Sequence, residues 1–165
     1  MNYKTVYDIS EYGYHEWTTV IAAAVVFGVS LLLFFIFKIS KKSLIWPCVT
    51  LLISIFLALM GAMTYWDYAR LKNRLVEKKT QVVSGVIERH WERKVWRNKT
   101  TDYYEGFTVN GVKFEYTVDH SAAGFTNSQK EKVPLRDGLP VRVHYVKDEL
   151  AGHSELRILK LEVKE

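Results

Sequence analysis

Two long apolar runs dominate the hydrophobic pattern of the first 66 residues. Residues 17–37 and residues 44–66 contain 21 and 23 residues without a single charge. An α-helix rises about 1.5 Å per residue and a bilayer's hydrocarbon core is about 30 Å thick, so each run is long enough to cross a membrane. Only residues 38–43 separate the two runs. The pattern therefore predicts a transmembrane helical hairpin over residues 17–66, with both chain ends on the same side.

The composition of these runs argues against both a signal peptide and a buried globular helix. A cleaved signal peptide has a shorter apolar core, and a helix buried in a globular protein keeps a polar stripe, whereas these runs are apolar all round. Small residues four apart, Ala24 with Gly28 and Ala58 with Ala62, offer close-packing faces. We expect them to pack within the hairpin, and association of hairpins into a homo-oligomer is the alternative. Aromatic residues typical of membrane interfaces flank the runs: Tyr12, Tyr14, Trp17, Trp46, Tyr65, Trp66 and Tyr68.

The segments on either side of the hairpin have different characters. Residues 1–16 are short and rich in tyrosine, and we expect an interfacial N-terminal segment that lies along the membrane or docks on the C-terminal domain. Residues 67–79 contain good helix formers and five basic against two acidic groups, which predicts a basic juxtamembrane helix. From residue 80 the pattern alternates with a period of two, as in β-strands.

The clearest strand signal is the segment from Phe107 to Tyr116. Asn110-Gly111 at its centre suits a two-residue type I′ turn, because both turn positions need positive φ. This turn pairs Val109 with Val112 and Phe107 with Phe114 on the face that should form the core, with Tyr103, Tyr116 and Val118. The opposite face, with Thr108, Lys113, Glu115 and Thr117, should meet water.

Three further segments alternate in the same way. Residues 82–88 form a strand that continues through residues 89–99, with Gly85 expected at a bulge or bend. Residues 139–146 and 156–163 form two more, and residues 120–132 form a loop. About five strands without a helix predict an all-β domain over residues 80–165, a small OB-like or SH3-like five-stranded β-barrel after the two transmembrane helices.

Charge and cysteine content narrow the possible partners. The formal net charge of +5 is concentrated beside the membrane, since residues 80–165 carry 14 basic and 13 acidic groups. The basic balance therefore favours contact with anionic lipid headgroups over nucleic acid. Cys48 is the single cysteine and lies inside the second apolar run. The cysteine and histidines show no metal-ligand spacing along the chain, so we expect no metal site and no cofactor.

The segment from residue 90 to residue 97 is the best candidate for a ligand or partner surface. It interleaves aromatic and basic side chains, which can stack on bases and neutralise phosphates. Strand periodicity puts its two tryptophans on opposite faces, one in the core and one exposed. The simpler interpretation is that the tryptophans pack on a neighbour while the charges face solvent, and contact with the membrane surface or a protein is a third. The candidate residues are His90, Trp91, Arg93, Trp96 and Arg97, with Arg142 and His144 as an extension.

An enzymatic function finds little support in the sequence. Asp119-His120-Ser121 has residue types used in nucleophilic catalysis, but neighbours in an extended chain point to opposite faces. No glycine-rich phosphate loop is present. We therefore expect a protein that is not an enzyme and has no catalytic residues.

Five segments of the β-domain have a specific spacing: residues 84–88, FTVNGVKFEY (107–116), GFTN (124–127), LRDGLPVRVHYV (135–146) and ILKLEV (158–163). Together they resemble a recurring domain of uncharacterised bacterial inner-membrane proteins. These proteins are similar in having a Tyr-Asp-Ile segment, here residues 7–9, and two helices before the domain. The resemblance implies a multi-pass protein of the bacterial inner membrane, and implies no catalytic residue. By architecture alone the chain is also similar to membrane effectors of bacterial cyclic-nucleotide anti-phage systems.

These observations lead to one expected function and two alternatives. We expect a non-enzymatic binding module, anchored in the lipid bilayer of the inner membrane, whose β-domain recognises a protein partner or ligand at the membrane surface. The first alternative is an immunity or exclusion protein that protects this membrane. The second is a membrane-disrupting effector gated by a nucleotide ligand. The count of basic residues near the helix ends predicts a cytoplasmic β-domain.

Overall fold

The computed structural model describes residues 2–41, 43–97, 100–118, 123–128, 132–148 and 155–164, with Arg97 and Glu155 described by their backbone alone. The chain forms two compact units. One unit is Tyr14–Ala69, and the other combines Met1–Gly13 with Arg70–Glu165. The Asp119-His120-Ser121 triplet lies outside the described residues, and of the predicted loop at residues 120–132 the structure describes 123–128 and 132.

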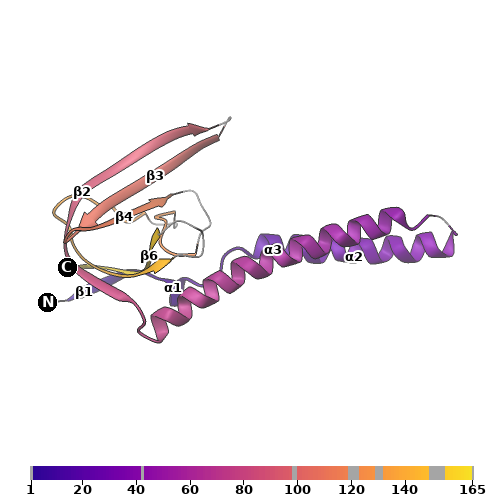
Figure 1. Ribbon diagram of the computed structural model, residues 1–165, viewed down its shortest axis with the longest axis horizontal. Coiled ribbons are helices and arrows are strands. Elements are labelled where there is room, and N and C mark those ends of the chain that lie inside the picture. Colours follow the sequence, from indigo (N-terminus) through magenta and orange to yellow (C-terminus); the bar gives the residue numbers. More distant parts are fainter. Residues whose placement is uncertain are drawn as a thin grey trace. The chain divides into compact units, whose positions relative to one another are not determined.

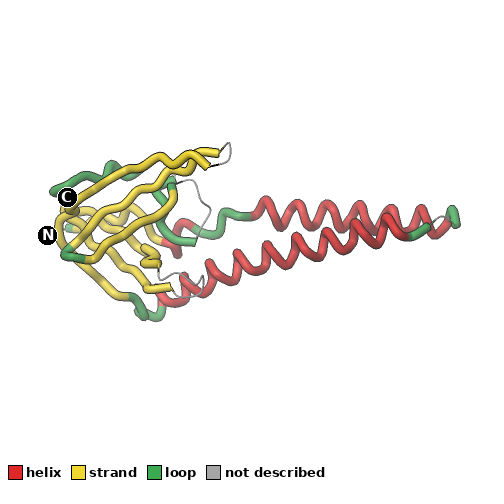
Figure 2. The backbone as a smooth tube through the Cα atoms, turned by 45° about the horizontal axis from the view of Figure 1, so that its top comes forward, coloured by secondary structure: helices red, strands yellow, loops and turns green. Residues whose placement is uncertain are grey.

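Two long helices form the first unit. Helix α2 (Trp17–Ile39) and helix α3 (Ile45–Val76) run antiparallel and side by side (Figures 1 and 2). Both are long and apolar enough to cross a membrane, and most of their large apolar side chains are exposed. Exposed apolar side chains on all faces suit a helix surrounded by lipid. The prediction of two long apolar helices is confirmed, and the second continues through the basic segment to Val76.

The two helices approach each other at Gly61. A Cβ atom added there would lie 3.1 Å from Cγ2 of Val20 on the facing helix. At Gly28 the same atom would meet no described heavy atom within 4 Å. The sequence pattern singled out Gly28, but of these two glycines it is Gly61 that lies against the facing helix, where a missing side chain allows close approach.

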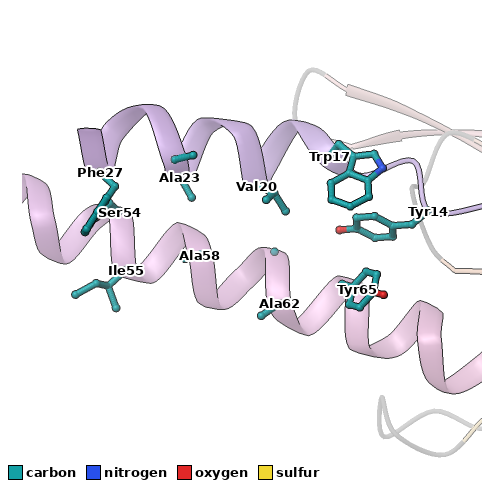
Figure 3. Close-up of a pocket in the computed structure, with 12 residues that line it drawn as sticks. Tyr14, Trp17, Val20, Ala23, Phe27, Ser54, Ile55, Ala58, Ala62 and Tyr65 are labelled. Atoms are coloured by element: carbon teal, nitrogen blue, oxygen red, sulfur yellow. The ribbon is translucent and has the colours of Figure 1, made fainter. Parts of the chain in front are cut away.

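An apolar groove of about 590 Å³ lies between α2 and α3 (Figure 3). Tyr14, Trp17 and Tyr65 stand at one end of it, and the Tyr14 hydroxyl shares a hydrogen bond of 2.7 Å with the Thr64 hydroxyl. The small residues Ala58 and Ala62 form part of the floor. A lining of this kind suits hydrocarbon, either a lipid chain or another apolar helix.

The described residues of the second unit form a six-stranded antiparallel sheet with the order β1-β6-β5-β2-β3-β4. A short helix, α1 (Ile9–Tyr12), follows the first strand, and the Asp8 carboxylate caps it by accepting a hydrogen bond from the Ser10 amide. The strands are β1 (Tyr3–Asp8), β2 (Gln81–Arg97), β3 (Thr100–Val109), β4 (Val112–Thr117), β5 (Pro140–Asp148) and β6 (Glu155–Lys164).

The sheet differs from the predicted five-stranded barrel in two respects. Residues of the N-terminal segment supply a sixth strand, β1, which pairs with β6. The hydrogen-bonded order begins at β1 and ends at β4, and within the described residues no pairing between these strands closes it. Helices combined with an all-β domain are confirmed, whereas barrel closure is not found and the OB-like or SH3-like type stays a prediction.

The hairpin of β3 and β4 has the predicted register. Asn110 and Gly111 adopt φ values of 48° and 79°, and the ladder pairs Val109 with Val112 and Phe107 with Phe114. Both phenylalanines are fully buried. The rest of this core comes from the alternating residues of the other strands, including Ile87, Val141, Val143, Leu159 and Leu161.

The bulge in β2 lies four residues beyond its predicted position. The β2–β5 register passes through Gly85 without a shift, so the bulge predicted there is wrong, and the alternative of a bend there stays a prediction. The β2–β3 register shifts between Glu88 and Trp91, where Arg89 has a φ of 53°. The Asp137 carboxylate accepts a hydrogen bond of 2.7 Å from the His90 amide. An extra residue in one strand exchanges the faces beyond it, so this bulge decides which β2 side chains face the core side.

A buried ionic cluster joins the last turns of α3 to the sheet. The Arg70 guanidinium donates two hydrogen bonds, of 3.0 and 2.8 Å, to the Asp148 carboxylate. The Arg157 Nε lies 3.1 Å from the same carboxylate, whose side chain is 4% exposed. Leu71, next to Arg70, is fully buried. These contacts explain why the chain from Arg70 onward belongs to the sheet unit.

Candidate functional site

Strands β2 and β3 continue beyond the rest of the sheet as a two-stranded arm (Figure 1). Strand β5 pairs with β2 only as far as Val86, and β4 pairs with β3 only from Tyr104. The segments 94–97 and 100–103, which we call the β-arm, are therefore paired in the described ladders only with each other. A two-stranded ribbon buries little surface, so its side chains stay available for contacts.

Exposed aromatic side chains lie along the β-arm. The Trp96 side chain is 74% exposed and Tyr103 is 43% exposed. The Lys94 ammonium lies 5.1 Å from the centre of the Tyr103 ring, within the range of a cation–π contact. Trp96 thus presents most of an indole to its surroundings.

The base of the arm carries a stacked group on the outer face of the sheet. Trp91 is half-buried opposite Gly106, and the Arg93 guanidinium lies 5.6 Å from the ring centres of both Trp91 and Tyr104. A Cβ atom at position 106 would lie 2.6 Å from the Trp91 ring, so a glycine is required beneath the indole. Trp91 and Trp96 stand on opposite faces, as strand periodicity requires, but neither lies in the hydrophobic core.

The remaining predicted residues occupy another part of the sheet. Arg142 lies on β5 opposite Ser84, which precedes Arg93 by nine residues, so the two arginines are roughly 30 Å apart along the strand direction. The Arg142 guanidinium stacks on Tyr3 at 4.1 Å and lies 3.5 Å from Glu162. The structure therefore does not bring Arg142 together with the arm. The side chain of Arg97 lies outside the described atoms.

His144 shares the surroundings of Arg142. Its Nε2 lies 3.8 Å from the Glu162 carboxylate, and Lys160 lies 3.3 Å from the other oxygen of that carboxylate. Burial lowers the pKa of His144, the Glu162 carboxylate opposes this shift, and the cations of Lys160 and Arg142 act in the same direction as burial. His144 is thus part of a local ion-pair group rather than of the surface at residues 90–97.

A polar cluster lies where the base of the arm meets β4, on the core side of the sheet. The register aligns Glu92, Glu105 and Tyr116 in one row across β2, β3 and β4. His90 Nε2 lies 2.9 Å from Oε1 of Glu105. One donor atom from each of His90, Glu92 and Glu105 lies within 4.8 Å of the others. Glu105 is buried, His90 is half-buried and Glu92 is exposed, so the cluster opens to solvent on one side.

Asn127 holds the buried carboxylate in place. Its amide Nδ2 donates to Oε2 of Glu105 at 2.9 Å and to the Val133 carbonyl at 3.2 Å. Its Oδ1 accepts a hydrogen bond of 2.9 Å from the Val133 amide. Asn127 has a φ of 52° and is 5% exposed. A buried asparagine in the left-handed region, with three hydrogen bonds, indicates that the orientation of Glu105 is fixed by the fold.

Tyr116 completes the cluster with its hydroxyl group. This oxygen is buried and has no hydrogen-bond partner among the described residues. Burial raises the pKa of Tyr116 well above its ordinary value, and the negative charges of Glu105 and Glu92 raise it further. The hydroxyl therefore stays protonated and can donate a hydrogen bond to an oxygen placed within the cluster.

Sequence reasoning found His90 but missed Glu92, Glu105, Tyr116 and Asn127. The alternation of His90 and Glu92 was visible, and the hairpin register already placed Tyr116 near the core. The sequence did not predict the bulge at Arg89, which turns His90 and Glu92 toward the face of Glu105. No glycine or asparagine marks that bulge, so the local sequence carried no signal for it.

No family model, curated protein or solved structure matches this chain. The resemblance to uncharacterised bacterial inner-membrane proteins therefore stays a prediction. The β-arm and the polar cluster are the two candidate functional features of the described residues.

Proposed function

We propose that this protein is a membrane-anchored binding module that recognises a protein partner through its β-arm. The observation that carries this proposal is the Trp96 indole, which is 74% exposed on a ribbon with little packing of its own. Burying an aromatic side chain removes about 150–250 Å² from water, which is worth a few kcal/mol. Tryptophan is also the residue type most enriched among the energetic centres of protein interfaces.

The backbone of the arm supports a protein partner. Strand β2 has no described strand partner on its outer edge from Trp91 to Arg97, so this edge can accept another strand. Partner strands often add to such edges, with main-chain hydrogen bonds giving affinity and alternate side chains giving specificity. Trp96 and Lys94 would supply those alternate side chains on one face.

The charge pattern disfavours a nucleotide as the ligand of the arm. Arg93 and Lys94 already stack on the aromatic rings of the arm and its base, and the acidic Glu92 and Asp102 stand among them. A nucleotide site needs uncompensated positive charge beside free aromatic faces. The nearly balanced charge of the arm and its base therefore suits a protein partner better than a nucleotide.

We place the protein in the bacterial inner membrane with the sheet unit in the cytoplasm. Strand β1 precedes α2 and pairs with β6, which follows α3, and this pairing supports a chain that returns to the same side of the membrane after α3. That side carries six basic residues near the helix ends and the connecting loop carries three, and basic residues favour the cytoplasm. The six are Lys4, Arg70, Lys72, Arg74, Lys78 and Lys79, and the three are Lys38, Lys41 and Lys42.

Photocrosslinking in living cells tests the binding function. A photoreactive phenylalanine analogue replaces Trp96 in one strain and Lys113 in a control strain, since Lys113 is also exposed but lies on β4 outside the arm. We expect one dominant protein adduct from position 96 and none from position 113. Equal adducts from both positions, or adducts of position 96 with copies of this chain alone, would contradict a specific partner of the arm.

A further inference from the structure

We propose that His90, Glu92 and Glu105 form a binding site for one divalent transition-metal ion. The three side chains come from β2 and β3, and the bulge at Arg89 brings them to one face of the sheet. This site does not depend on the proposed binding function. The metal site lies at the base of the arm, whereas the proposed protein partner binds the β-arm itself.

The geometry of the donor atoms suits a single ion. Bonds from zinc to protein nitrogen and oxygen atoms are about 2.0–2.2 Å long, so two donors of one tetrahedral zinc ion stand about 3.4 Å apart. His90 Nε2 and Glu105 Oε1 share a hydrogen bond of 2.9 Å, and the Glu92 carboxylate lies within 4.8 Å of both atoms. An ion would replace this hydrogen bond and move its two atoms apart by about half an ångström. Glu92 is exposed, so a small rotation of its side chain can close the set around an ion.

The charges of the cluster also favour a cation. Glu92 and Glu105 are direct partners in the β2–β3 register, and like charges opposite each other destabilise a sheet. His90 can supply at most one positive charge, whereas a divalent ion neutralises both carboxylates. One imidazole and two carboxylates form a ligand set that suits zinc or manganese better than magnesium or calcium, which prefer oxygen ligands alone.

The surroundings of the cluster have the features of an outer coordination shell. Asn127 fixes the second oxygen of Glu105 at 2.9 Å, which leaves Oε1 directed toward His90. The Tyr116 hydroxyl is a buried donor without a hydrogen-bond partner in the described part of the chain. A water or hydroxide on the fourth position of the ion would give that hydroxyl an acceptor. Outer-shell partners of this kind orient metal ligands and raise affinity.

Metal binding to the purified full-length protein in detergent tests the proposal. The protein carries no histidine tag, is stripped with a chelator and is titrated by calorimetry with Zn²⁺, Mn²⁺, Mg²⁺ and Ca²⁺. We expect one equivalent of Zn²⁺ or Mn²⁺ to bind more tightly than Mg²⁺ or Ca²⁺, and bound Co²⁺ to show the visible absorption of a low-symmetry site. Absence of binding of Zn²⁺ and Mn²⁺ at 100-fold molar excess would overturn the proposal.

Glu92→Gln is the decisive variant because the exposed side chain can change without disturbing the core. We expect it to weaken binding at least about tenfold, in line with the loss seen when even an outer-shell partner is removed. Glu115→Gln is the matched control, since Glu115 is exposed on the opposite face of β4, next to Tyr116. Unchanged affinity in both variants would locate the ion elsewhere and overturn the proposal.

Discussion

Trp91 lies directly opposite Gly106 in the β2–β3 ladder, and its indole occupies the space of the missing side chain. A Cβ atom at position 106 would lie 2.6 Å from two ring carbons of Trp91 and 2.8 Å from its ring nitrogen. The Arg93 guanidinium stacks on this indole, with its carbon 5.6 Å from the ring centre. One glycine thus supports the stacked group at the base of the β-arm.

Gly106→Ala should therefore destabilise the sheet unit by about 1–3 kcal/mol, as overpacking does elsewhere. Chemical unfolding of the full-length protein, followed by tryptophan fluorescence, measures the change. Combining Gly106→Ala with Trp91→Leu should recover part of the loss, because leucine leaves room for the new methyl group. Equal costs of Gly106→Ala with and without the Trp91 ring would contradict this contact.

Gly111 should respond to substitution for a different reason. A Cβ atom there would meet no described heavy atom within 4 Å, but its φ of 79° is strained for other residues. Gly111→Val should cost on the order of 1–3 kcal/mol, while Gly111→Asn should cost less because asparagine tolerates this region. Thermal unfolding of the two variants compares them. Similar melting temperatures for both would mean that the backbone conformation does not limit the turn.

Gly61 and Gly28 form a matched pair in the helical hairpin. Gly61→Leu places side-chain atoms against Val20, so it should separate α2 from α3 and lower the thermal stability in detergent. Gly28→Leu should leave the stability nearly unchanged, since the space around Gly28 is open. The melting temperatures of Gly61→Leu and Gly28→Leu in detergent are compared with that of the wild type. A larger effect at Gly28 would show that the helices pack through the face that the sequence pattern indicated.

Removing the Asp148 carboxylate should strongly destabilise the sheet unit. Asp148→Asn leaves the guanidinium groups of Arg70 and Arg157 beside a neutral amide in a buried setting. Loss of one partner from a buried ion pair costs about 3–5 kcal/mol. Lys79→Gln, which removes an exposed ion pair with Glu77, should cost less than about 1 kcal/mol. Denaturant midpoints for both variants test the difference.

The sequence predicted best where a local rule was strong. The apolar runs gave both helices, because length and hydropathy alone decide whether a helix can cross a membrane. Asn110-Gly111 gave the hairpin register, because positive φ at both positions selects the turn. Neither inference needed any knowledge of contacts distant in the chain.

The sequence predicted least where distant segments meet. Strand β1 is six residues long and pairs with β6 more than 150 positions away, so its short tyrosine-rich pattern resembled an interfacial segment. The polar cluster depends on the bulge at Arg89, which has a positive φ. Arginine is uncommon at positive φ, so the sequence did not predict this bulge. Asn127 reaches Glu105 from a loop whose position follows from tertiary packing alone.

The affinity of the crosslinked partner for this protein in lipid nanodiscs tests the central claim most directly. Binding is compared for the wild type, Trp96→Ala and the control Lys113→Ala. Because truncation of a central interface tryptophan costs about 2 kcal/mol or more, we predict that Trp96→Ala weakens binding at least about 30-fold and that Lys113→Ala changes it less than threefold. Equal affinities of the wild type and Trp96→Ala would contradict recognition through the β-arm.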